Sequence, residues 1–530
     1  MRFSLGKDLW VLIFAGTLLV AGSAIHLATM RQDAPTVDEP VYLAAGAGYW
    51  QTGRIEFNLE HPPLAKWIQG IPLLFLHPTS PFEARPAPLK PEFEIGATFL
   101  FQNRVPADLI VWMGRLPSLA LWIILGAALF ATARRWGGST AGLIALTLYT
   151  FDPTVLAHGH LATNDIMLTA SLFLAAVFFE RMIRQPTMTT ILLSTFFIVL
   201  PPFMKFSGLL MGPVFACTLL LSSISWKQKS FVLLYAGGWF LLLTLLLTGG
   251  DPRIIIDGIQ WQAGHNSYGH ESNLFGQWSW DGWWYYFPMA FLFKTPLATI
   301  ILTIASALAA IQQRHTRDTD PQTNAHRAIY RILPATFAIT SLFVNLDIGI
   351  RYLLPIFPFL FMGIGVILAR QISRMREMTR RWGVEFTSIL LGILVMNTLL
   401  SYPHYLSFFN LIAGGRENGH RVLNDSNLDW GQDLKRLRGS LDANPPAEPI
   451  YLDFFGARDA AEYYLNDHLF ISRHLPANTP SSEGTYIVSA FYRWRPQYAW
   501  LDSVQPFRTI GSSILLYDLS KLPFPSRMLP

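Results

Sequence analysis

Charged residues are scarce in this chain. Lys, Arg, Asp and Glu make up 14% of its 530 residues, whereas hydrophobic residues make up 51%. A soluble domain carries about 25% charged residues, so this chain lacks the polar side chains needed to coat a water-soluble globule of its length. The sequence has one cysteine, Cys217. A single cysteine excludes an internal disulfide and a thiolate metal site. The same composition excludes a disordered chain, a collagen-like fibre and a small disulfide scaffold.

Apolar and aromatic residues are abundant instead. Aromatic residues make up 14% of the chain, and such side chains gather at membrane interfaces. A helix needs about 20 apolar residues to cross a bilayer. The first candidate, 9–28, could be a signal peptide, but it is long, lacks a clean cleavage site and precedes further spans, which favours a retained anchor. With it, about eleven transmembrane helices are predicted, the others near 108–133, 139–157, 165–180, 188–204, 207–222, 231–248, 288–311, 332–346, 352–369 and 383–401.

Basic residues occur in every second short loop between these segments. They are Arg134, Arg135, Arg181, Arg184, Lys227, Lys229, Arg314, Arg317, Arg327, Arg331, Arg370, Arg374, Arg376, Arg380 and Arg381. The positive-inside rule places these loops and the N-terminus in the cytoplasm, and an odd number of spans places the C-terminus outside. The net charge of +5 therefore reflects topology and does not indicate a nucleic-acid partner.

The external side is expected to hold three long segments, 29–107, 249–287 and 402–530. We divide the chain into a transmembrane bundle over 1–401, which includes the first two segments, and a small extracytoplasmic α/β domain over 402–530. In that domain the pattern predicts strands at 449–456, 484–493 and 508–519, and helices from about 432 and over 457–467.

Acidic and imidazole groups follow the first span. Asp38 and Glu39 are adjacent, so one carboxylate can face a cavity as a base or ligand while the other orients it. The alternative is a solvated turn or a helix cap. His61 precedes Pro62 and Pro63 and is a candidate contact for a phosphate or an acceptor, with a rigid turn as the alternative.

Four basic residues approach the external face, where the positive-inside rule predicts few. They are Arg115, Lys205, Lys294 and Arg351. A lipid phosphate at this face explains the set, because guanidinium and ammonium groups near a bilayer need an anionic partner. Snorkelling to lipid headgroups is the alternative for each one alone. Asp165, at the start of a span, is expected to share a cavity with Asp38.

Metal binding is not predicted. His158 and His160 lie close to Asp165 in the sequence, and His265 and His270 lie in the middle external segment, but neither group has a recognised ligand spacing. The acidic segment 424–433 lacks the Gly and Glu of a calcium loop. We interpret it as a helix start, capped by Ser426 or Asp429.

Several short motifs together resemble a known family. They are Asp38-Glu39, His61-Pro62-Pro63-Leu64-Ala65-Lys66, Trp283–Pro288, Phe293–Pro296, Ile350–Pro355 and Asp425–Asp433. Over about residues 10–440 the chain is similar to the dolichyl- and polyprenyl-phosphate-mannose protein mannosyltransferases, glycosyltransferase family 39, and above all to bacterial members. The resemblance implies the GT-C fold, a transmembrane helix bundle with its active site on the external face.

The resemblance also implies roles for individual residues. Asp38, with Glu39, matches the acidic catalytic motif, and Arg115 matches an arginine near the lipid phosphate. Asp165 and Lys205 match by their place in the bundle. No cofactor and no obligatory metal are implied. The chain departs from the eukaryotic enzymes in lacking a loop long enough for their β-trefoil domain, which leaves both a protein and a glycolipid acceptor open, because lipid A aminoarabinose transferases share the architecture.

The function expected from the sequence is transfer of a sugar, in a mannosyltransferase-like reaction, from a polyprenyl-phosphate donor to an acceptor hydroxyl. Asp38 would act as base in an inverting single displacement, at the external face of a bacterial inner membrane. A polytopic transporter or lipid flippase is the alternative. It would explain the spans and the intramembrane charges but gives no role to the large external tail or to the Asp-Glu motif, and paired repeats are not visible.

Overall fold

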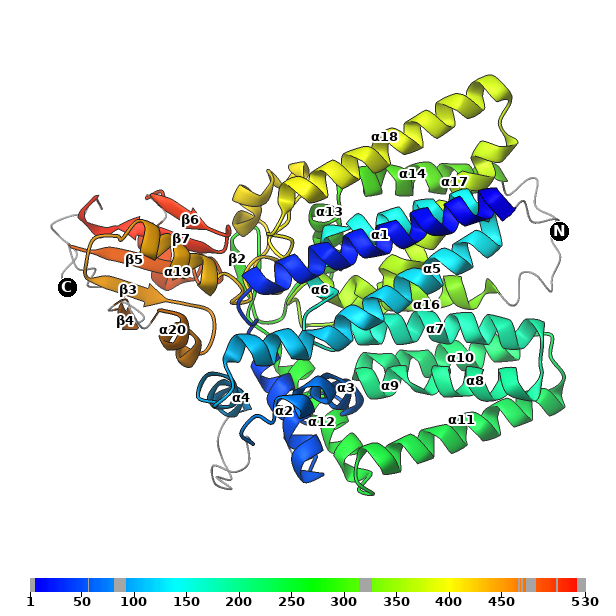
Figure 1. Cartoon of the computed structure of the whole chain (residues 1–530), viewed down its shortest axis with the longest axis horizontal. Coiled ribbons are helices and arrows are strands. Elements are labelled where there is room, and N and C mark those ends of the chain that lie inside the picture. Colours follow the sequence, from blue (N-terminus) through cyan, green and yellow to red (C-terminus); the bar gives the residue numbers. More distant parts are fainter. Residues whose placement is uncertain are drawn as a thin grey trace.

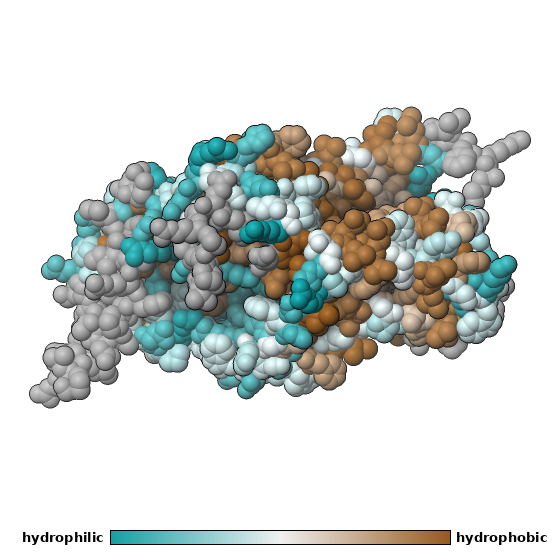
Figure 2. Space-filling view, turned by 90° about the horizontal axis from the view of Figure 1, so that it is seen from below, coloured by the Kyte–Doolittle hydropathy of each residue, from teal (hydrophilic) through white to brown (hydrophobic). Residues whose placement is uncertain are grey.

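The protein is described from a computed structural model that covers residues 5–55, 57–80, 92–313, 327–465, 468, 470–472, 483–501 and 504–521. Arg314 and Arg317 lie outside these residues. Long helices lie side by side in a bundle, and a sheet domain lies at one end of it (Figure 1). On the face drawn in Figure 2, hydrophobic residues cover much of the bundle, whereas the coloured residues at the end with the sheet domain are largely hydrophilic. The expected helical membrane protein with a small C-terminal α/β domain is therefore confirmed.

The bundle is built from twelve of the described helices, both long and short. They are α1 (Leu5–Gln32), α5 (Ala107–Phe151), α7 (Asp165–Arg184), α8 (Met188–Val199), α9 (Pro201–Met204), α10 (Met211–Leu220), α11 (Trp226–Leu247), α13 (Tyr286–Lys294), α14 (Leu297–Gln313), α16 (Ile329–Thr340), α17 (Phe357–Arg374) and α18 (Glu377–Ser401). Five further helices lie in the segments that connect these: α2 (Glu39–Thr52), α3 (Leu64–Gly70), α4 (Glu92–Phe101), α6 (Pro153–His158) and α12 (Arg253–Tyr268). Short 3₁₀ helices join several of them: η1 (Ile71–Phe75), η2 (Phe206–Leu210), η4 (Ser341–Phe343) and η5 (Ile350–Ile356).

Helix α5 is a hairpin of two helices. Gly138, at φ 82°, breaks the helical path. Beyond it the chain folds back, so that Gly142 lies against Phe130, and the Tyr149 hydroxyl donates to the Trp122 carbonyl at 2.8 Å. A left-handed φ is accessible to glycine at little cost, which is why the turn falls here. The two predicted segments 108–133 and 139–157 therefore run antiparallel.

The span predicted at 288–311 is wrong as a single helix. Helices α13 and α14 meet at an angle of 111°. The break falls at Thr295-Pro296, because proline has no N–H and disfavours helical geometry in the residue before it. In the described part of the chain, six helices are long and apolar enough to cross a membrane, or seven if this bent pair is one span. The segments 188–204, 207–222 and 332–346 form shorter helices, so the number of about eleven spans stays a prediction.

The basic loops meet at the end of the bundle far from the sheet domain (Figure 1). Arg135 and Arg184 both pair with Glu180, which is fully buried. Arg370 donates to the Trp136 carbonyl at 2.8 Å. Loops that lie far apart in the sequence are therefore neighbours at this end.

The C-terminal domain is a five-stranded sheet with two helices. Its strand order is β4-β3-β5-β7-β6, in which β3 is parallel to β4 and β5, and β7 is antiparallel to β5 and β6. The elements are α19 (Leu434–Ala443), β3 (Ile450–Asp453), α20 (Arg458–Leu465), β4 (Phe470–Ser472), β5 (Thr485–Ser489), η9 (Pro496–Leu501), β6 (Arg508–Ile510), β7 (Ile514–Asp518) and η10 (Leu519–Lys521). The strand predicted at 508–519 is wrong, because it turns at Gly511 into the β6–β7 hairpin, and β4 was missed.

The segment before α19 joins this domain to the bundle. It holds the turns η6 (Leu411–Ala413), η7 (Arg416–Arg421) and η8 (Asp425–Asn427), and the hairpin β1 (Ser272–Leu274) and β2 (Gln277–Ser279) lies beside it. The Asn427 side chain accepts from the Ile350 amide at 2.9 Å. The helix cap predicted at Ser426 or Asp429 is wrong, because α19 begins after Asp433, close to the helix start predicted near 432. Ser426 instead donates to the Ile348 carbonyl, and Asp429 accepts from Ser489.

Candidate functional site

Asp38 and Glu39 point in different directions at the start of α2. The Asp38 carbonyl accepts from the amides of Val41 and Tyr42, which begins the helix at this point. The strand-like pairing of residues 34–37 with 430–432 fixes the chain just before it, through bonds such as Val37 N–H to the Trp430 carbonyl at 2.9 Å. Glu39 is fully buried, whereas the Asp38 side chain is 23% exposed and faces a cavity.

Glu39 is bound on both carboxylate oxygens to Arg115. The two N–H···O distances, from Nε and Nη2 of Arg115, are both 2.7 Å, and Glu39 also accepts from the amides of Ala162 and Thr36 at 2.8 Å. These bonds and the neighbouring Arg115 lower the pKa of Glu39 although burial, the largest influence, raises it. The carboxylate is thus ionised and structural.

Arg115 does not line the cavity that Asp38 faces. Its side chain is fully buried, and its remaining donors bind the carbonyls of Met30, Asp33 and Ala34. Glu39 supplies the anionic partner of Arg115 inside the fold, so Arg115 does not extend to the cavity that Asp38 faces. It anchors the loop before Asp38.

Lys294 is likewise turned away from the site. Its ammonium group donates to the carbonyls of Leu406, at 2.7 Å, and Asn427, and lies 4.4 Å from the centroid of the Phe409 ring. It is 2% exposed. Lys294 ties the broken helix pair to the segment before the sheet domain, and it does not line the cavity that Asp38 faces.

Two of the four predicted cations, Lys205 and Arg351, lie beside Asp38 and Asp165. Arg351 lies 3.1 Å from Asp38 and 3.7 Å from Asp165, and Lys205 lies 2.6 Å from Asp165. The Trp430 ring centroid is 4.1 Å from the Arg351 guanidinium carbon. The residues come from α2, α7, the α9–η2 break and η5, so four distant segments build one charged cluster, which we call the junction: Asp38, Asp165, Lys205 and Arg351.

The backbone shape around Arg351 depends on its contact with segment 424–433. Gly349 has φ 155°, and a Cβ atom there would lie 2.2 Å from the Ser426 hydroxyl. Only glycine therefore permits this close approach. Together with the Asn427 bond to Ile350, this contact holds Arg351 toward Asp38 and Asp165.

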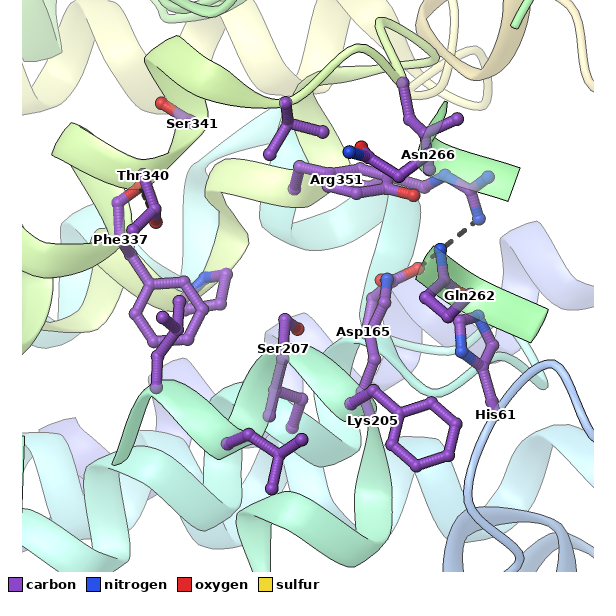
Figure 3. A pocket seen from close by; sticks show the side chains of 18 of the residues that line it. His61, Asp165, Lys205, Ser207, Gln262, Asn266, Phe337, Thr340, Ser341 and Arg351 are labelled. Carbon is purple, nitrogen blue, oxygen red and sulfur yellow. Dashed lines mark hydrogen bonds and ion pairs between the residues drawn. The ribbon is translucent and has the colours of Figure 1, made fainter. Parts of the chain in front are cut away.

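A cavity of about 510 Å³, the apolar cavity, opens on one side of the junction. His61, Asp165, Lys205 and Arg351 gather at one side of it, and Phe337 and Thr340 from α16 lie across from them (Figure 3). Most of its other walls are apolar side chains, among them Leu168, Leu209, Leu210, Pro213, Ile259, Val344, Leu346 and Pro355. A cavity with apolar walls and charges at one end suits an amphiphilic lipid.

A second cavity of about 660 Å³, the acidic cavity, opens on the other side of Arg351. Four carboxylates line it: Asp38, Glu60, Glu92 and Asp425. Aromatic rings of Phe93, Trp261, Tyr268, Trp430 and Phe455 complete much of the wall. Helix α12 separates the cavities, since Gln262 and Asn266 line the first while Trp261 and His265 line the second.

Burial raises the pKa of Glu60 to about 7, helped by repulsion from Asp38 and Glu92. Burial also raises the pKa of Asp425. Sequence reasoning missed both residues as lining of the site. Glu60 directly precedes His61, and Asp425 begins one of the family-like motifs, so both signals were present, but nothing in the sequence showed that 425 lies beside 38.

The histidines do not form a metal site in the described part of the chain, where no group of three or more His, Cys, Asp or Glu side chains could hold an ion. His61 lines the apolar cavity, its ring parallel to that of Tyr42 at 6.2 Å, and its Nδ1 atom is buried without a hydrogen-bond partner. His160 lies 2.9 Å from His26, Nδ1 to Nδ1, and His265 lies 3.9 Å from Glu60.

Fold and site together define a class, a polytopic helical membrane protein in which an apolar cavity and an acidic cavity share the paired charge of Arg351. Residues 108–247 match the family described as dolichyl-phosphate-mannose-protein mannosyltransferase. The resemblance expected from the motifs is thereby confirmed over these residues, which are about a quarter of the chain. Among curated proteins, the sequence comparison finds no match.

Two solved structures are similar in outline. One is ArnT from Cupriavidus metallidurans bound to undecaprenyl phosphate, with 13% identity, a TM-score of 0.46, and coverage of 98% of this chain and 99% of that chain. The other is the archaeal oligosaccharyltransferase AglB from Archaeoglobus fulgidus in complex with an inhibitory peptide and a dolichol-phosphate. It has 10% identity, a TM-score of 0.48, and coverage of 98% of this chain and 75% of that chain.

Proposed function

We propose that this chain transfers a sugar from a polyprenyl-phosphate donor to an acceptor hydroxyl, with Asp38 as the base. The observation that carries the proposal is the meeting of the apolar and acidic cavities at the junction. A polyprenyl-phosphate sugar has an apolar chain, an anionic link and a polar ring in that order. The apolar cavity, the two cations and the acidic cavity follow the same order.

The donor phosphate would bind between Lys205 and Arg351. Both cations line the apolar cavity and both are now paired with carboxylates. A phosphate oxygen that takes over the Arg351 contact would release Asp38, 3.1 Å away, from its ion pair. Donor binding would thereby free the carboxylate that the reaction needs as a base.

The chemistry is a single displacement. The acceptor oxygen attacks the anomeric carbon as its proton passes to the Asp38 carboxylate, and the bond from that carbon to the phosphate oxygen breaks. The electron pair of that bond leaves with the phosphate, whose charge Lys205 and Arg351 stabilise. Attack from the face opposite the leaving group inverts the anomeric centre, and the acidic cavity favours the oxocarbenium-like transition state.

The remaining expectations form part of the proposal. The junction would face the exterior of a bacterial inner membrane, with the basic loops in the cytoplasm and the domain from 402 onward outside. The sugar would be a hexose such as mannose, and the acceptor a protein or a glycolipid hydroxyl. No cofactor is required, because the lipid phosphate is itself the leaving group.

The test is sugar transfer in membranes that carry Asp38→Asn. Radiolabelled polyprenyl-phosphate sugar and candidate acceptors are added, and labelled product is counted. We expect at least about a hundredfold loss, the scale of a missing general base. Asp257→Asn is the matched control, since Asp257 is exposed on α12 and lines neither cavity. Undiminished transfer by Asp38→Asn refutes the role of Asp38, and no transfer by the wild type from any such donor favours the transporter.

A further inference from the structure

The acidic cavity carries more negative charge than its own cations offset. Among the described residues, its lining holds four carboxylates but only one guanidinium, that of Arg351, which is already paired with Asp38 at 3.1 Å. In the part of the chain that the structure describes, no lysine or arginine nitrogen lies within 4 Å of the carboxylates of Glu60, Glu92 or Asp425. The proposed reaction gives an individual role to Asp38 alone, so three carboxylates are left without one.

Asp425 is the most buried of these three carboxylates. It is 6% exposed, and its Oδ1 atom accepts from the Ser426 amide. No described residue donates a hydrogen bond to its other oxygen, Oδ2. A carboxylate removed from water without a counter-charge is costly, and burial accordingly raises the pKa of Asp425. A positive group in the cavity would supply the missing partner.

Glu60 and Glu92 form a second acidic group in the same cavity. Glu92 accepts from the Asn58 side chain at 2.7 Å, and Glu60 lies 3.9 Å from His265, an imidazole whose pKa is lowered by burial. The charge of Lys66 acts on both carboxylates, but this side chain is fully buried, donates to two backbone carbonyls and does not line the cavity. Both carboxylates can therefore still pair with a cation that enters the cavity.

The two acidic groups lie around the proposed base. Repulsion from Asp38 raises the pKa of both Glu60 and Asp425, so Asp38 is close to each of them. They come from separate segments, since Glu60 precedes α3 and Asp425 belongs to η8. A peptide with basic side chains on both sides of its hydroxyl matches this distribution, whereas a sugar with one amino group supplies a single positive charge.

Helix α12 adds aromatic rings to the wall of this cavity. Trp261 and Tyr268 line it, and both side chains are exposed. His265 positions the Trp261 ring, because the two rings meet edge to face with centroids 5.1 Å apart. Aromatic faces pack on the aliphatic stem of a lysine or arginine side chain and attract its charge. The wall therefore favours long basic side chains over a compact cation.

We propose that the acidic cavity selects a basic acceptor peptide, in which lysine or arginine side chains flank the serine or threonine hydroxyl that receives the sugar. This role rests on the proposed function, because it places that hydroxyl beside Asp38. Glu60, Glu92 and Asp425 bind the flanking ammonium or guanidinium groups through charge-assisted hydrogen bonds. The exposed rings of α12 cover the stems of the same side chains. The cavity volume, about 660 Å³, leaves room for the sugar as well.

Binding of short peptides to the full-length protein in detergent tests the site without any donor. The probes are acetylated and amidated pentapeptides in which either two lysines or two glutamines flank a central serine. They are titrated by calorimetry at pH 8, where Glu60 is largely ionised. We expect the lysine peptide to bind at least about tenfold more tightly, although the net charge of +5 opposes its non-specific adhesion. Equal affinities, or no binding of the lysine peptide, overturn the proposal.

Variants locate the preference in the cavity. Glu60→Gln and Asp425→Asn should each reduce the ratio of the two affinities about fivefold or more, because each removes one negative charge. Glu60 is 25% exposed, so Glu60→Gln keeps the test valid if Asp425→Asn fails to fold. Asp257→Asn is the control, since Asp257 is exposed on α12 and does not line the cavity. A ratio that is unchanged in Glu60→Gln, or that falls equally in Asp257→Asn, contradicts the proposal.

A competition assay tests the alternative of an amino sugar. Glucosamine is added to the complex of the wild type with the lysine peptide, and glucose serves as its uncharged control. We expect glucosamine to displace the peptide only at concentrations well above those of the peptide, because it offers one ammonium group for two acidic groups. Displacement by glucosamine, but not by glucose, at equal or lower concentration assigns the cavity to an amino sugar and overturns the peptide.

Transfer kinetics separate this role from the proposed function. With a polyprenyl-phosphate sugar as donor, the lysine peptide should have an acceptor KM about tenfold below that of the glutamine peptide, at equal kcat and equal donor KM. If the wild type transfers sugar to neither peptide while the titration still shows the preference, the proposed function fails and the binding site stands. If both peptides are glycosylated with equal acceptor KM, the proposed function stands and the selection of a basic acceptor is refuted.

Discussion

Removing one partner of the Glu39–Arg115 pair should destabilise the fold and leave donor binding intact. Both side chains are fully buried, and two N–H···O bonds of 2.7 Å join them. Glu39→Gln keeps the shape but leaves a buried guanidinium without its anion. Loss of one partner from a buried pair costs about 3–5 kcal/mol of unfolding free energy, and Arg115→Met should cost a similar amount.

The double variant separates the pair energy from other effects. Once both charges are gone, neither is left uncompensated, so Glu39→Gln with Arg115→Met should be less destabilised than the sum of the singles by about 2 kcal/mol or more. The measurement is equilibrium unfolding in mixed micelles of rising SDS content. Arg253→Met with Asp251→Asn is the control, because that pair is mostly exposed and its removal should change little.

Donor kinetics give the result that would refute this reasoning. If Arg115 held the lipid phosphate, Arg115→Met would raise the donor KM at least about tenfold without lowering stability, and Glu39→Gln would not share the effect. The structure predicts the opposite pattern, in which both singles lose stability alike and the folded fraction of each keeps the wild-type donor KM.

Further predictions concern the junction, the broken helix pair and the acidic cavity. Lys205→Gln should raise the donor KM about tenfold in initial-rate assays, whereas Lys205→Arg should retain most of the affinity. Lys294→Met should lower the melting temperature without changing the donor KM, because it leaves the buried carbonyls of Leu406 and Asn427 without a donor. Burial raises the pKa of Glu60 from 4.5 to about 7, so the folded protein holds a proton that the unfolded chain releases earlier. The contribution of Glu60 to the free energy of unfolding should therefore be highest below pH 4.5. It should fall by up to about 3 kcal/mol as the pH rises from 4.5 through 7.

Each of these predictions has its own control. Equal donor KM values for Lys205→Gln and Lys205→Arg would show that Lys205 does not bind the donor phosphate. A changed donor KM in Lys294→Met would show that Lys294 contributes to donor binding. Glu60→Gln should flatten the loss of stability between pH 5 and 8, and an unaltered pH profile would show that Glu60 is not the titrating group.

Much of the architecture was readable from the sequence because it depends on composition and local order. Few charges and long apolar segments define a membrane protein in any fold. Basic residues occur in every second loop between the spans. Because consecutive antiparallel helices begin at opposite ends of a bundle, this pattern predicts that the basic loops share one end. Adjacent carboxylates must diverge, which is why Asp38 faces a cavity and Glu39 does not.

Tertiary structure alone decided which cations belong to the junction. Arg115, Lys294, Lys205 and Arg351 were alike in sequence, since each is a basic residue near the external end of an apolar segment. What distinguishes them is the partner brought in from elsewhere in the chain: Glu39 for Arg115, backbone carbonyls for Lys294, and Asp165 for the other two. The role of a buried charge depends on which group it pairs with. That group lies far away along the chain, so the sequence does not show which one it is.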